Sequence, residues 1–263
     1  MREDNKKILL KFLSSEQPFE HGNLKRHSVL IQILTDCRLF TNRNFKTGEY
    51  DMEIDNKIGS PHRWLPAIGY LCVLDMIGNA FRKVGGNNPK NSYSNIPYAL
   101  ENFADELIDN KKGYIDALVA LRNSFAHNLS LLNIPDSPQK KQNQLQRFGV
   151  YVDTENKNFE LKMSKNRWDG IAFKKNYSLA DDRTDIDLHL IGNLVEQVLK
   201  NLIEGIKHDT IEVQEIEEVY ELEKEENGIK IKEKKKRRIE SLKDEDYKVI
   251  SFLNKYTFVI TND

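Results

Sequence analysis

The fold is decided by a stretch near the middle of the chain, "YIDALVALRNSFAHNLSLLN", Tyr114–Asn133. On a wheel of about 100° per residue, six of its apolar residues share one helical face. They are Ile115, Leu118, Val119, Phe125, Ala126 and Leu129. The position seven after Ile115 is Arg122, so we expect a guanidinium in the middle of this apolar face. An unpaired buried charge is costly, and such a group is normally paired or put to use.

Two polar residues accompany the arginine. Asn123 and His127 are four positions apart, so they share a flank of the same helix. A structural interpretation is that Arg122 pairs with a carboxylate and that His127 is incidental. A functional interpretation is that Arg122, Asn123 and His127 form a site. Helix geometry alone favours the structural interpretation.

Composition narrows the class of protein. The 263 residues suffice for one large domain, or for a domain with an appendage. A net charge of −1 excludes a globally basic nucleic-acid binder, so any such site must be local. The cysteines, Cys37 and Cys72, lie in separate apolar runs and are expected to be buried free thiols. No signal-peptide core and no membrane-length apolar run is present, so a cytoplasmic protein without membrane partners is expected.

Apolar periodicity predicts a helical bundle. Helices are expected at about 24–40, 64–86, 96–109, the opening stretch and 186–206, the last capped by Thr184 or Asp185. Alternating apolar residues around "TENKN" predict a β-hairpin inserted at about 148–164. The segment 41–63 reads as a loop or a weak hairpin.

The composition changes after about residue 207, where an acidic run precedes a basic one. This region is either a charged helix pair or a hairpin turning at Asn227–Gly228, and the Asn-Gly pair slightly favours the hairpin. The apolar segment 247–260 is expected to pack back onto the body. The predicted fold is therefore mainly α, with a helical domain at 1–208 and a charged extension at 209–263.

Few motifs compete for the chemistry. The chain has no phosphate-loop signature and no metal-ligand spacing on a helix. An arginine precedes a histidine by five or six positions in two places, "RNSFAH" (122–127) and "RTDIDLH" (183–189). The second lies at a helix start among acidic residues, so a capping and salt-bridge role is expected for it.

"LRNSFAH" within a helical bundle resembles the signature of the HEPN superfamily, in which an Arg is followed by a polar residue and then by a His four to six positions after the Arg. The apolar helix "GYLCVLDMIGNAF" and the long helix near residue 200 are also similar to that family's arrangement, so the resemblance spans about 24–207. Members are typically metal-independent RNases of toxin–antitoxin, CRISPR-associated and phage-defence systems. The resemblance implies an RNA substrate, no cofactor, no metal, and a homodimer whose motif helices face each other across a composite cleft.

The residue types suit this chemistry. The 2′-OH of RNA can attack the neighbouring phosphate, which leaves a 2′,3′-cyclic phosphate and a 5′-OH. His127 would transfer protons, and Arg122 would hold the charge that grows on the phosphate. Asn123 would bind the phosphate or orient His127, whereas Ser124 faces away from His127 and is a weaker candidate.

Alternatives stay open at this stage. Some family toxins carry a Tyr two residues after the His, which a partner enzyme modifies; here Leu129 stands there, which weakens the case for that kind of antitoxin. A non-catalytic RNA- or nucleotide-binding and dimerisation module is the main rival. A structural subunit that docks a partner through its charged tail is another. The basic run 230–238 could contact RNA, but a solvated charged face is favoured.

Overall fold

The computed structural model of the chain describes residues 1–51, 64–85, 95–104, 111–128, 131–133, 146–151, 162–165, 182–214, 218–226, 229–237 and 244–260. The helices are α1 (Glu3–Phe12), α2 (Val29–Phe40), α4 (Trp64–Ala80), α5 (Ile96–Phe103), α6 (Lys111–Asn128), α7 (Leu188–Lys207) and α8 (Asp244–Tyr256). The strands are β1 (Phe19–His21), β2 (Leu24–Ser28), β3 (Phe81–Lys83), β4 (Leu132–Asn133), β5 (Gln146–Tyr151), β6 (Thr184–Asp187), β7 (Ile211–Val213), β8 (Glu218–Glu226), β9 (Ile229–Arg237) and β10 (Thr257–Val259). The predicted mainly-α class is confirmed.

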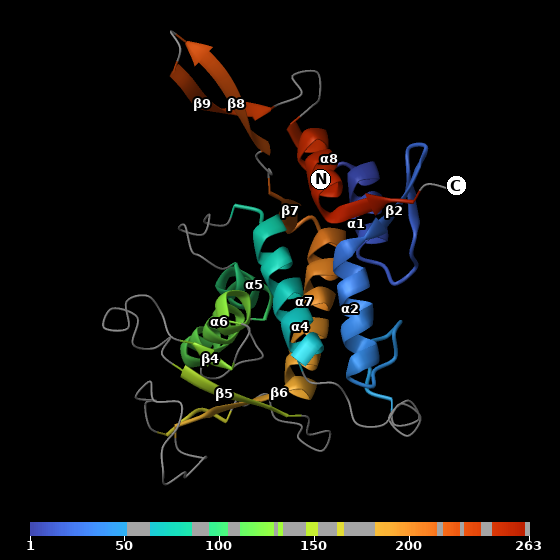
Figure 1. Cartoon of the computed structure of the whole chain (residues 1–263). Coiled ribbons are helices and arrows are strands. Elements are labelled where there is room, and N and C mark those ends of the chain that lie inside the picture. The colour runs from blue at the N-terminus through green and yellow to red at the C-terminus, as the bar shows by residue number, and fades with distance from the viewer. Residues whose placement is uncertain are drawn as a thin grey trace.

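Helix α4 lies at the centre of the bundle. It packs against α2 on one side and against α5 and α6 on the other, with α7 alongside (Figure 1). Its sequence is apolar around most of its circumference, as expected of a helix with several neighbours. Tyr70, Leu74 and Ile77 of α4 are fully buried and occupy the middle of the core.

The helix predicted at 24–40 begins later than expected. Residues 24–28 form β2, which pairs with β1 across a turn at Gly22 (φ +61°). Arg26 and Ser28 are buried, whereas Lys25 is exposed and His27 is only half-buried, which is the alternation of a strand. Helix α2 then begins after Ser28, whose Oγ accepts a hydrogen bond from the N–H of Ile31.

The second predicted helix ends earlier than expected. Helix α4 stops at Ala80, and the next three residues form β3, which pairs antiparallel with β7. The glycine expected to end the helix, Gly85, instead adopts a positive φ of 72° beyond β3. The helix predicted at 96–109 is confirmed as α5 up to Phe103, and residues 105–110 lie outside the described part.

The predicted hairpin at 148–164 is not what the described residues show. Strand β5 pairs in parallel with β6 and antiparallel with β4. Lys162 forms a bridge with Asp185 of β6. Residues 152–161 lie outside the described residues. Single-sequence alternation marks a strand but not its partner, and β6 is more than 30 residues away along the chain.

The long helix α7 is confirmed, but its cap differs from the prediction. Thr184 and Asp185, the predicted caps, belong to β6. The N-cap is Asp187, whose carboxylate accepts a hydrogen bond from the N–H of His189 at 2.9 Å.

The C-terminal region contains the predicted hairpin and a helix. Strands β8 and β9 pair antiparallel from Glu218↔Arg237 to Glu226↔Ile229, and they project from the body (Figure 1). The predicted turn residues, Asn227 and Gly228, lie outside the described residues. Helix α8 packs on α1, and β10 pairs with β2, so the apolar segment 247–260 does return to the body. The division at residue 208 stays a prediction.

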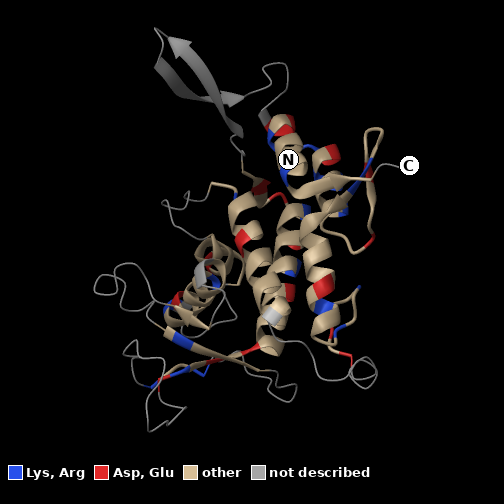
Figure 2. Cartoon of the chain, viewed as in Figure 1, with Lys and Arg blue, Asp and Glu red and all other residues tan. Residues whose placement is uncertain are grey.

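Residues of both charge signs are interspersed along the described helices and strands in Figure 2, in agreement with the net charge of −1. None of the described helices is long and apolar enough to cross a membrane.

Candidate functional site around Arg122

The buried face of the motif helix overlaps only in part with the face that its spacing predicted. Ile115, Leu118 and Phe125 of the predicted face are buried. The other buried side chains of α6 are Tyr114, Ala117, Ala120, Leu121 and Ser124. Arg122 therefore lies beside the core face rather than in its middle, and its side chain is 30% exposed. Ala126, which was assigned to the apolar face, is exposed. Apolar residues surround much of α6, so packing against α4 and α5 decides which face is buried.

Arg122 has a carboxylate partner on α4. Its Nη2 lies 3.6 Å from Oδ2 of Asp75, and its Nη1 donates a long hydrogen bond (3.4 Å) to Oδ1 of Asn123. The other oxygen of Asp75 accepts a hydrogen bond from the backbone N–H of Asn95, at the start of α5. Asp75 thus connects α4, α5 and α6. The sequence offered one signal for it, a single acidic residue inside an otherwise apolar helix.

Two other arginines show how differently Arg122 is held. Arg38 is 4% exposed and makes a bidentate contact with Glu196, at 2.7 Å for each bond. Arg43 is 1% exposed, and its Nη atoms donate to the oxygens of Gly48, His189 and Asn193. Arg122 is half-buried, and in the described part of the chain it makes only the two long contacts above. Its fork of N–H donors can therefore reach a phosphate from solvent.

The geometry of the helix relates the three motif residues. His127 lies in the last turn of α6, and its side chain falls outside the described part. Asn123 is half-buried on the same flank as His127, one turn earlier. Arg122 and His127 are separated by about 140° around the axis and about 7.5 Å along it. Their backbone positions therefore lie on different sides of the helix.

Ser124 takes no part in this surface. It is buried, and its Oγ donates to the carbonyl of Leu121 at 2.6 Å. This buried position agrees with the expectation that Ser124 is a weaker candidate for the site.

The expectation that both cysteines are buried is wrong for Cys72. Cys37 is a buried free thiol as predicted, but Cys72 is exposed, one turn before Asp75 on α4. Desolvation of its sulfur and the charge of Asp75 raise the pKa of the Cys72 thiol, and Arg122 only partly opposes them. The thiol therefore stays protonated near neutral pH and is a poor nucleophile.

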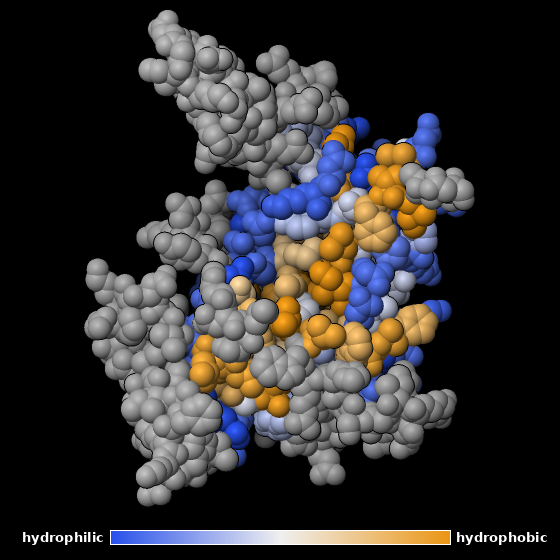
Figure 3. Space-filling model, viewed as in Figure 1, coloured by the Kyte–Doolittle hydropathy of each residue, from blue (hydrophilic) through white to orange (hydrophobic). Residues whose placement is uncertain are grey.

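An apolar stripe on α4 runs up to this site. Leu65 is 61% exposed, Ile68 and Met76 are only partly buried, and Cys72 is exposed between them. Figure 3 shows apolar side chains gathered over α4 on the face in view. Their spacing of three or four residues places them on one side of the helix, the side that carries Asp75.

The second Arg–His pair has the structural role that its acidic neighbours suggested. Nε of Arg183 lies 2.6 Å from Oδ1 of Asp185, and Asp187 caps α7 at His189. The carbonyl of His189 accepts from Arg43.

In the described residues, no three His, Cys, Asp or Glu side chains gather closely enough to hold a metal ion. Comparisons with protein-family models, with curated proteins and with solved structures find no match to this chain.

Proposed function

We propose that this protein is a metal-independent endoribonuclease of the HEPN type, which acts in phage defence or in a toxin-like system of growth control. The observation that carries the proposal is the partly exposed Arg122 on the motif helix, next to the partly exposed apolar stripe of α4. A permanently charged fork within reach of solvent can take an RNA phosphate.

In this proposal each motif residue has one task. Arg122 binds the phosphate oxygens and stabilises the charge that grows on them during attack by the 2′-OH. His127 moves the protons, to or from the 2′-OH and the departing 5′-oxygen. Asn123, on the flank of His127, hydrogen-bonds the phosphate or fixes the imidazole. The products carry a 2′,3′-cyclic phosphate and a 5′-OH.

A second copy of the chain supplies the rest of the cleft. Arg122 and His127 diverge by about 140° on one helix, so a single helix does not aim both at one phosphate. A two-fold contact between the α4 and α6 faces would cover the apolar stripe and bring two motif helices together. The stripe from Leu65 to Met76 is the kind of exposed surface that such a contact removes from water.

Asp75 would hold Arg122 until RNA arrives. An ion pair between two partly exposed groups 3.6 Å apart is worth roughly 0–1 kcal/mol, so a phosphate can displace it at small cost. Asp75 is then a positioning residue and does not itself move protons.

The ion pair between Arg122 and Asp75 also favours a second candidate function. The structural interpretation of Arg122 required a carboxylate partner, and Asp75 is one. In that alternative the protein is a non-catalytic module that binds RNA or nucleotides, or dimerises, through α6.

Cleavage of labelled single-stranded RNA in EDTA distinguishes the two functions. We expect the wild type to cut and to leave a 2′,3′-cyclic phosphate. Arg122→Ala and His127→Ala should each lose activity by about 10²-fold or more. Arg183→Ala is the matched control, because its side chain is 31% exposed and also pairs with an aspartate.

Oligomeric state and thermal stability are measured on every variant first. If folded wild-type dimer cuts no RNA, and Arg122→Ala loses only stability or dimerisation, the enzyme is rejected in favour of the binding module. Activity that disappears in EDTA but survives His127→Ala would also contradict the proposed mechanism.

A further inference from the structure

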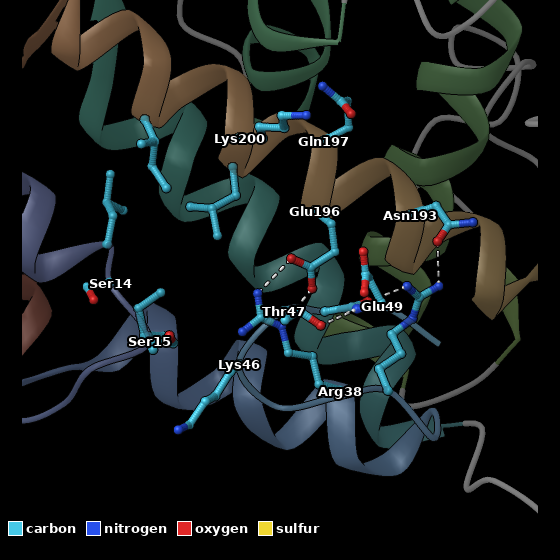
Figure 4. Close-up of a pocket in the computed structure, with 16 residues that line it drawn as sticks. Ser14, Ser15, Arg38, Lys46, Thr47, Glu49, Asn193, Glu196, Gln197 and Lys200 are labelled. Atoms are coloured by element: carbon cyan, nitrogen blue, oxygen red, sulfur yellow. Dashed lines mark hydrogen bonds and ion pairs between the residues drawn. The ribbon is translucent and has the colours of Figure 1, made fainter. Parts of the chain in front are cut away.

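A hollow of about 630 Å³ lies between α2, the segment after it, and α7 (Figure 4). Its size falls within the usual range of small-molecule sites. Ser14 and Ser15, just after α1, stand at one end, and Lys46 and Thr47 lie near the Arg38–Glu196 pair. It shares no residue with the Arg122 site.

The hollow carries an excess of positive charge. Its lining holds four cations, Arg38, Arg43, Lys46 and Lys200, but only two carboxylates, Glu49 and Glu196. Arg38 and Glu196 neutralise each other through their bidentate contact. The oxygens that bind Arg43 are uncharged, so these contacts leave its buried charge uncancelled.

The electrostatic field of a charge that no carboxylate neutralises is only weakly screened in a recess of low dielectric. Lys46 and Lys200 are exposed on opposite sides of the hollow (Figure 4), and the ammonium of Lys46 lies over the ring of Phe45. Both charges add to the field of Arg43. The excess of two positive charges stands out in a chain whose net charge is −1. Such a recess attracts an anion.

Part of the wall is apolar. Ile203 is only partly buried, and it lines the hollow beside Leu13, Ile31 and Leu199, of which only small parts are exposed. A ligand with a flat organic portion would cover this apolar surface, whereas an inorganic ion would not. The serine and threonine hydroxyls and the amide of Gln197 offer hydrogen bonds between the apolar wall and the cations.

We propose that this hollow binds a small phosphorylated ligand of the nucleoside-monophosphate class, whose phosphate is attracted by the excess of positive charge and whose ring packs on the apolar part of the wall. The site is separate from the RNA cleft proposed above and does not depend on it.

Isothermal titration calorimetry on the full chain tests this site with three probes: adenosine 5′-monophosphate, adenosine and inorganic phosphate. We expect saturable binding of the monophosphate and much weaker binding of the other two. Lys46→Gln and Lys200→Gln should each weaken it about threefold, and the double variant about tenfold. Ser15→Trp, at an exposed position, should block the hollow.

The control is Lys7→Gln, an exposed lysine of α1 outside the hollow, which should bind like the wild type. Binding should also weaken as salt is raised. Absence of saturable binding, equal affinity for phosphate and the monophosphate, or full binding by the double variant each overturns the proposal. So does binding that Arg122→Ala abolishes while Ser15→Trp leaves it intact, because the ligand would then sit at the motif helix.

Discussion

Three arginines of this molecule differ in their burial and in the groups that they contact. Arg38 is matched by a carboxylate, Arg43 is matched by neutral oxygens, and Arg122 keeps part of its fork in solvent. The first two need glycines nearby. A Cβ on Gly192 would lie 2.8 Å from Nε of Arg43, and one on Gly48 would overlap the carboxylate of Glu196.

Loss of the carboxylate that neutralises Arg38 should destabilise the fold. Glu196→Gln leaves a buried guanidinium facing a neutral amide, and we expect the free energy of unfolding to fall by about 3 kcal/mol. Urea denaturation measures the change. Glu204→Gln, which removes an exposed carboxylate 2.8 Å from Lys207, should change stability by no more than about 0.5 kcal/mol. Equal effects of the two substitutions would show that Arg38 does not need its partner.

His21 should make stability depend on pH. Desolvation, with a smaller contribution from the charge of Arg26, lowers the pKa of His21 below its ordinary value of 6.5. The unfolded chain then binds more protons below about pH 6.5, so stability falls as the pH falls through this range. Denaturation of the wild type and His21→Gln between pH 5 and 8 tests this. The wild type should lose more stability on acidification, and parallel curves would contradict the assignment.

At the scale of elements, α2 and α4 approach closely where a glycine faces a cysteine. A Cβ on Gly69 would overlap Sγ of Cys37, although alanine normally suits a helix better than glycine. Gly69→Ala should therefore destabilise the protein by about 1–3 kcal/mol.

Cys37→Ala should relieve part of that loss, because it removes the overlapped sulfur. A double-mutant cycle with Gly69→Ala, measured by thermal or urea denaturation, should give a coupling of at least about 0.5 kcal/mol. Additive effects would mean that the two helices do not meet at this pair.

Long periodic segments could be predicted from the sequence because their burial is regular. The core of α4, the whole of α7 and the pairing of β8 with β9 follow from spacing and from the turn chemistry expected between the two strands. Helix α1 was not anticipated, and residues 24–28 were assigned to a helix. Short strands such as β2, β3 and β6 pair with partners far along the chain, and local pattern carries no information on those partners.

The candidate site, like the fold, could be predicted from the sequence only in part. Residue types identified Arg122 and Asn123, and the structure places both on α6 with partly exposed side chains. Their exact face could not be predicted, since α6 is apolar on several sides. The partner Asp75 and the network around Arg43 and Glu196 depend on which helices meet, and this is settled by tertiary packing.

At the scale of the whole molecule, the projecting hairpin should be dispensable for folding. Strands β8 and β9 pair only with each other in the described sheets. Replacing residues 218–237 by a short Gly-Ser linker should leave the cooperative unfolding transition in place, with a Tm within about 4 °C of the wild type. Loss of the transition in calorimetry would mean that the hairpin supports the body.

The proposed dimer predicts a further outcome. Leu65→Asp places a charge on the apolar stripe of α4, and it should yield a folded monomer with little RNase activity. Val84→Asp is the control, because Val84 is 58% exposed, close to the 61% of Leu65, but follows β3. Light scattering coupled to gel filtration gives the masses. A monomeric wild type, or a dimeric Leu65→Asp, would contradict an interface on this face.

The pairing of early and late segments has a consequence for synthesis. Helix α1 packs against α8, Arg2 contacts Glu245 and Asp246, and β10 adds to β2. A nascent chain therefore exposes the part of α1 that α8 covers while more than 200 further residues are made, and closure waits until about residue 259 leaves the ribosome. At about 5–20 residues per second, that interval lasts at least about ten seconds. During this interval α6 has already been synthesised, but α8 and β10, which complete the body, have not.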